Sequence, residues 1–83
     1  MLLKYLNELD RAVQEARKRP GLEQFNHCAE CLHVLRNYLD GQMAPVRERA
    51  EEIIDRMLPA EFDYWMSQVM APRHGMLQVA RAL

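Results

Sequence analysis

Hydrophobic residues in the first part of the chain recur every three or four positions, as on one face of an amphipathic helix. The residues that share this spacing are Leu2, Leu6, Leu9, Val13 and Ala16. The pattern predicts a helix over about residues 2–18, because residues three and four apart lie on the same helical face. Pro20 and Gly21 follow, and both favour a turn that ends the helix.

The next segment, about residues 22–40, carries two apolar stripes on one predicted helix. The first stripe consists of Phe25, Cys28, Leu32, Leu35 and Leu39, and the second of His27, Cys31, Val34 and Tyr38. The stripes lie roughly 120° apart on a helix that turns ~100° per residue. We expect the first stripe to meet the preceding helix, and the second to meet later helices or a second copy of the chain.

Two shorter helices are predicted in the second half of the chain. Pro45 favours the first turn of a helix over about residues 45–58, since proline lacks the N–H that this turn leaves unpaired. Pro59 disfavours helical backbone at the residue before it, and so separates this helix from another over about residues 60–70. Met76–Leu83 is apolar enough for one or two further helical turns.

The arrangement of the helices follows from the turns between them. The helices over about 2–18 and 22–40 have similar lengths and a short connection, so we expect an antiparallel helical hairpin. The shorter helices, about 45–58 and 60–70, then pack across it. The sequence therefore predicts an all-α fold, a small helical bundle, in a single domain over residues 1–83.

Composition and charge narrow the class of protein. The 83 residues are 49% hydrophobic and 28% charged, which is typical of a globular domain. A chain of this size buries roughly 64% of its unfolded surface, so its core is small and a homodimer is expected to stabilise it. The formal net charge is −1. Nucleic acid is therefore not expected as a direct ligand, because surfaces that bind it are usually basic.

Neither a secretion signal nor a membrane segment is evident in the sequence. Met1–Lys4 does not begin an apolar signal region, and no run of about 18 apolar residues occurs. We therefore expect a cytoplasmic protein that does not enter a membrane. Its two cysteines are then expected to be reduced thiols.

Possible zinc ligands cluster in one predicted helix: His27, Cys28, Cys31 and His33. Zinc needs four ligands in a tetrahedron, but on an intact helix His33 points away from His27. Only His74 elsewhere in the chain could complete the set. We therefore expect no metal and no cofactor. A zinc- or redox-sensing protein that uses Cys28 and Cys31 remains an alternative, particularly if a dimer supplies ligands.

Motifs of common enzymes are missing from the sequence, and we expect no catalytic residues. The chain contains no G-x-S-x-G, no phosphate-binding loop and no H-E-x-x-H motif. Glu51, Glu52 and Asp55 could share a helical face, but arginines lie among them. Such a pattern is typical of a solvated helix surface.

Aromatic and thioether side chains gather in the predicted helix over about residues 60–70, and both types are common in binding surfaces. Together with the second stripe they give the expected partner-binding residues: Val34, Tyr38, Tyr64, Trp65, Met66 and Met70. Tyr64 lies opposite the apolar side of its helix, so we expect it to be exposed or in an interface. Trp65 and its neighbours could instead cap the core of the hairpin.

These observations predict a small, non-enzymatic protein-binding module: a regulator, inhibitor, adaptor or accessory subunit. It would occlude or bridge another protein through an apolar patch around Tyr38, Tyr64 and Trp65, rimmed by charges.

A DNA- or nucleoid-associated modulator is the other alternative. The cations that favour it are Arg17, Lys18, Arg19, Arg36 and Arg73. Pro59–Met66, which follows an acidic helix, resembles the closing segment of the Hha/YmoA modulators of nucleoid proteins. Its proline-to-tryptophan spacing is similar to that of the theta subunit of bacterial DNA polymerase III. Both resemblances imply a small helical accessory protein, and no functional residue is transferred from either family.

Overall fold

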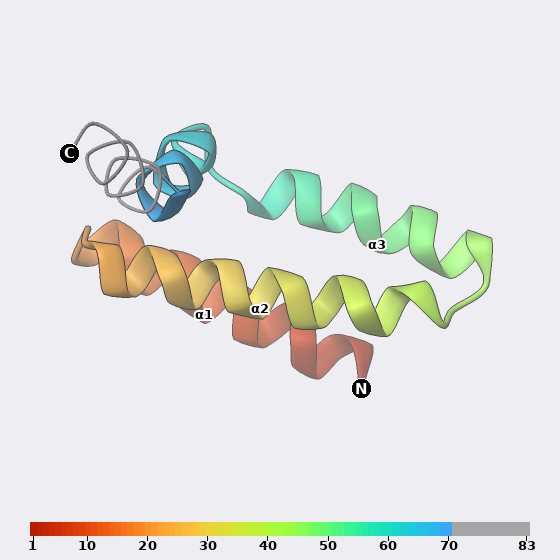
Figure 1. Cartoon of the computed structure of the whole chain (residues 1–83). Coiled ribbons are helices and arrows are strands. Elements are labelled where there is room, and N and C mark those ends of the chain that lie inside the picture. The colour runs from red at the N-terminus through yellow and green to blue at the C-terminus, as the bar shows by residue number, and fades with distance from the viewer. Residues whose placement is uncertain (71–83) are drawn as a thin grey trace, which may run out of the picture.

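Residues 1–70 are the part of the chain that the computed structural model describes, and they form an all-helical bundle without a strand (Figure 1). The helices are α1 (Leu2–Lys18), α2 (Leu22–Asp40) and α3 (Ala44–Met57), followed by a helical segment over 62–70. The predicted all-α fold is confirmed, and the third and fourth helices are displaced from their predicted starts by one and two residues. The predicted turns in Met76–Leu83 lie outside the described residues.

The turn between α1 and α2 reverses the chain and creates the predicted antiparallel hairpin (Figure 1). Arg19 leaves the helical conformation at φ −132° and ψ 76°, and its N–H donates to the carbonyl oxygen of Glu15 at 2.9 Å. Gly21 is extended at φ −178° and ψ 160°, and α2 starts directly after it. The positive charges of Arg17 and Lys18 suit the last turn of α1, where the helix dipole favours cations.

The core of the bundle is centred on the first apolar stripe of α2. Every residue of that stripe is buried: Phe25, Cys28, Leu32, Leu35 and Leu39. One side of it is covered by α1, through Leu6, Leu9, Ala12, Val13 and Ala16. The other side is covered by Ala50 and Ile54 of α3 and by Phe62 and Trp65 of the segment 62–70. The helix α2 is thus the central element, with a layer packed on either side.

The shorter helices do not cover the second stripe of α2, so that part of the expectation is wrong, whereas a second copy of the chain as its neighbour stays a prediction. The ring of Tyr38 lies against Tyr5 of α1, with ring centroids 5.1 Å apart, and Val34 is 46% exposed. On the opposite flank of α2, Arg36 lies 4.0 Å from Glu51 of α3. The physical reason is that the first stripe is wide enough to be covered from both sides, which places α3 away from the second stripe.

None of the helices described over residues 1–70 is both long enough and apolar enough to span a membrane.

Candidate protein-binding site

The residues predicted to bind a partner are divided between two regions of the bundle. Val34 and Tyr38 lie toward the end of α2, beside the first turns of α1. Trp65 instead stacks on Phe25, in the first turns of α2. Phe25 and Tyr38 are separated by roughly 20 Å along the helix axis, at ~1.5 Å per residue. A single patch around Tyr38, Tyr64 and Trp65 is therefore not formed.

Trp65 is a core residue in this structure, as the alternative interpretation of the sequence proposed. Its side chain is 4% exposed and stacks on Phe25, with ring centroids 5.3 Å apart and planes 13° apart. Phe62 meets the same indole edge-on, at 6.1 Å and 60°. Trp65 is thus inaccessible to a partner in this conformation, and its role is to join the segment 62–70 to α2.

Other residues of the segment 62–70 remain accessible. Tyr64 is 61% exposed and Met70 is 57% exposed, while Met66 is half-buried. The exposure of Tyr64 agrees with its predicted position opposite the apolar side of its helix. Of the predicted residues in this segment, Tyr64 and Met70 therefore offer the largest fractions of their surface to a partner.

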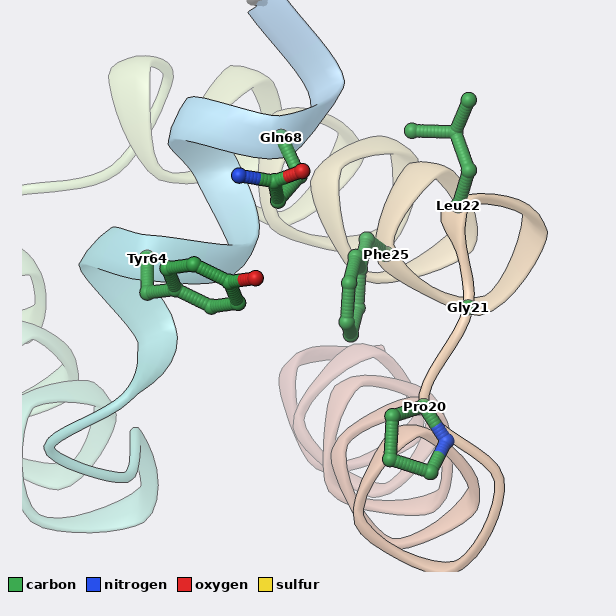
Figure 2. Close-up of a pocket in the computed structure, with 6 residues that line it drawn as sticks. All are labelled: Pro20, Gly21, Leu22, Phe25, Tyr64 and Gln68. Atoms are coloured by element: carbon green, nitrogen blue, oxygen red, sulfur yellow. The ribbon is translucent and has the colours of Figure 1, made fainter.

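A groove of about 340 Å³ opens between the α1–α2 turn and the segment 62–70 (Figure 2). Its lining residues are Pro20, Gly21, Leu22, Phe25, Tyr64 and Gln68. The Tyr64 ring reaches across the groove with its hydroxyl toward Phe25, and the Gln68 amide lies on the same wall (Figure 2). This volume is at the lower end of the ~300–1,000 Å³ of typical ligand pockets, so it suits one large side chain.

Sequence reasoning missed most of the residues that form this groove. The sequence predicts a turn at Pro20 and Gly21, and indicates no binding role for Leu22 or Gln68. Leu22 carries a usable signal in the sequence, because it follows a turn and lies outside both apolar stripes of α2; in the structure it is 46% exposed. The pairing of this turn with the segment 62–70 is a tertiary contact that no local spacing indicates.

Charged residues surround the groove unevenly. The Arg17 Nε lies 3.7 Å from the Glu61 Oε1, which links the end of α1 to the chain just before the segment 62–70. Both side chains are about half exposed, so the pair contributes less than about 1 kcal/mol. Lys18 and Arg19 are exposed and form no ion pair within the described part of the chain.

The cations that favoured a nucleoid-associated modulator are partly engaged within the bundle. Arg17 pairs with Glu61, and Arg36 pairs with Glu51. Arg73 lies outside the described residues. Of the five cations that favoured this function, Lys18 and Arg19 are therefore the two without an ion pair in residues 1–70, whereas nucleic-acid binding usually needs several phosphate contacts.

The cysteines lie in an environment that keeps them protonated. Burial, and to a smaller extent the nearby Cys31, raises the pKa of the fully buried Cys28 thiol to about 11. Burial, followed by the negative charges of Glu8 and Glu30, raises the pKa of the Cys31 thiol. Because the thiolate is both the nucleophile and the metal ligand, this environment disfavours both kinds of chemistry.

The histidines near these cysteines do not assemble a metal site. The Cys31 Sγ lies 3.8 Å from the His27 Nε2, whereas the His33 Nε2 is hydrogen-bonded to the Asn37 amide at 3.2 Å. Over residues 1–70 no group of three potential ligands is close enough to hold a metal ion. His74, the remaining predicted ligand, lies outside that range.

The buried thiol of Cys28 gives a prediction about alkaline stability. Its folded pKa of about 11 exceeds the ordinary value of 9.0. Its stabilising contribution is therefore complete below pH 9.0 and is lost as the pH rises toward 11. We expect the unfolding free energy to fall less between about pH 8 and about pH 10.5 in Cys28→Ala than in the unmodified chain. Urea denaturation at both pH values measures this, and equal losses would contradict it.

Comparison with known proteins adds no functional information. A scan of protein-family models, a search of curated proteins and a search of solved structures each found no match. The resemblances of Pro59–Met66 to two accessory families are therefore unsupported by a family match, and the groove has to be interpreted from its own geometry.

Proposed function

We propose that this protein is a non-enzymatic module that binds another protein through the groove between the α1–α2 turn and the segment 62–70. The observation that carries the proposal is an apolar groove lined by the exposed Tyr64 on one side and the exposed Leu22 on the other, with Phe25 between them (Figure 2). Tyrosine is enriched among the residues that dominate binding energy, because it supplies a large, rigid apolar surface with a polar end.

The aromatic contact beneath the groove holds the groove in shape, so a partner would bind to a preformed surface. Phe25 stacks on the buried Trp65, so the floor and one wall of the groove are held by the same aromatic contact. Binding to a preformed site loses less conformational entropy than binding to a site that has to become ordered. We therefore expect the module to act in the cytoplasm as a regulator, inhibitor, adaptor or accessory subunit that occludes or bridges its partner.

Affinity capture from the native cell tests the proposal. We expect Tyr64→Ala to reduce the recovered partner by about 30-fold, which corresponds to the ~2 kcal/mol of a residue that dominates an interface. Leu3→Ala is the matched control, since Leu3 is also highly exposed but lies at the opposite end of α1. Undiminished recovery with Tyr64→Ala, or an equal loss with Leu3→Ala, would contradict the proposal.

A homodimer is a separate proposal, which the exposed part of the second stripe supports. Val34 is flanked along that stripe by the half-buried Cys31 and Tyr38. Val34→Glu is expected to abolish association and to leave the hairpin folded, because the side chain is already partly in water. Sedimentation of both chains at micromolar concentration measures this. A species of about 10 kDa for the unmodified chain would refute the dimer.

A further inference from the structure

We infer that the groove accepts an acidic peptide segment of a partner protein: a large apolar side chain enters the groove, and neighbouring carboxylates face Lys18 and Arg19. The inference rests on the proposed function, and it states the chemistry of the partner at the same site.

The positive edge of the groove lies at the end of α1. Arg19 directly precedes Pro20, which lines the groove, so their Cα atoms are only ~3.8 Å apart. Arg17 is already balanced by Glu61. Lys18 and Arg19 have no such counter-charge within residues 1–70 and project from an exposed part of the chain. Two uncompensated cations therefore border the apolar groove at its turn side.

The acidic residues that adjoin groove residues in the sequence are not among the residues that line the groove. Glu23 follows Leu22 in the first turn of α2, and Asp63 precedes Tyr64; both acidic residues are exposed. Attraction and repulsion between exposed charges act over the Debye length of about 8 Å at physiological salt. Carboxylates of a bound peptide are therefore favoured where they come within this distance of Lys18 and Arg19, beside an apolar side chain in the groove.

A peptide fits this surface better than a nucleic acid does. Nucleic-acid affinity comes from several phosphates that each meet a lysine or arginine. Next to the groove in the sequence, only Lys18 and Arg19 are cations without an ion pair in residues 1–70, which is too few for several such contacts. A peptide needs only one apolar side chain, which would enter the groove, and a few carboxylates, which would face Lys18 and Arg19.

Titration of the full chain with three synthetic peptides tests the inference by NMR. The peptides are EEEGWLG, QQQGWLG and KKKGWLG, which share a tryptophan anchor and differ only in flanking charge. We expect amide shifts centred on Leu22, Phe25, Tyr64 and Gln68, with the acidic peptide bound about 3- to 10-fold more tightly than the neutral one. The basic peptide should bind most weakly. At about 0.5 M salt this preference should largely disappear.

A charge-matched pair of variants makes the test specific. Lys18→Gln with Arg19→Gln should remove the preference for the acidic peptide. Lys4→Gln with Arg11→Gln removes the same charge from the exposed face of α1 and should leave that preference intact. All four side chains are exposed, so neither variant is expected to unfold the bundle.

Each other outcome has a defined meaning. Equal binding of the three peptides, shifts centred elsewhere, or no shift at millimolar peptide would overturn the inference. If capture of the native partner still depends on Tyr64, the proposed function survives that result. A DNA duplex that shifts the Lys18 and Arg19 amides more strongly than the acidic peptide would replace the peptide with a nucleic-acid ligand.

Discussion

Trp65→Ala is expected to reduce the free energy of unfolding by about 3–5 kcal/mol, the usual cost of truncating a buried aromatic side chain. The indole is 4% exposed and contacts both Phe25 and Phe62. Its loss leaves a cavity between α2 and the segment 62–70 and removes a stacked aromatic pair. Small domains have total unfolding free energies of about 5–15 kcal/mol, so this loss is large enough to unfold part of the population.

Urea denaturation followed by circular dichroism measures this effect, and Tyr64→Ala provides an adjacent control. Tyr64 is 61% exposed, so its truncation should change stability by less than about 0.5 kcal/mol. The two variants therefore separate a residue that supports the groove from one that lines it. A loss for Trp65→Ala as small as that expected for Tyr64→Ala would contradict the assignment of Trp65 to the core. A loss for Tyr64→Ala as large as that expected for Trp65→Ala would disqualify Tyr64→Ala as a binding probe.

Leu35→Ala is expected to cost about 2–5 kcal/mol, the second largest effect. Leu35 is completely buried in the first stripe of α2, where α1 and α3 approach the helix from opposite sides. A cavity there is bordered by side chains on three helices. Its walls cannot collapse without moving an entire helix, which places the cost in the upper part of that range.

Val34→Ala is the matched control for Leu35→Ala, since it changes the next residue on the same helix. Val34 is already substantially exposed, and its truncation should cost less than about 1 kcal/mol. Thermal and urea unfolding of both variants at low concentration avoid any contribution from association. A larger loss for Val34→Ala would show that the second stripe, and not the first, forms the structural centre of α2.

Local periodicity was sufficient to predict the helices and the central stripe of the core. The bounds of α1 and α2 coincide with the predicted ranges, because Pro20, Gly21 and Gly41 interrupt strong apolar repeats. All five residues of the first stripe are buried as expected. Both results depend on the phase of side chains within a single helix, which the sequence specifies directly.

The contacts between helices were predicted less well, for a physical reason. Helical phase shows that Trp65 and Phe62 share an apolar face, but not that Phe25 covers this face. In the same way, the spacing of Tyr38 does not reveal that Tyr5 of α1 lies against it. The groove depends on such a contact, between the α1–α2 turn and a segment about 40 residues later.

The position of α2 between two packed layers has a consequence for cooperativity. One wall of the groove belongs to the α1–α2 hairpin, and the other belongs to a segment that reaches the hairpin only after α3. A ligand in the groove therefore binds only molecules in which the two halves are docked, and it opposes their separation by mass action. At 100 times its Kd, such a ligand adds about 2.7 kcal/mol to the cost of opening the bundle. Amide exchange in α3, which does not line the groove, would then slow when the groove is occupied.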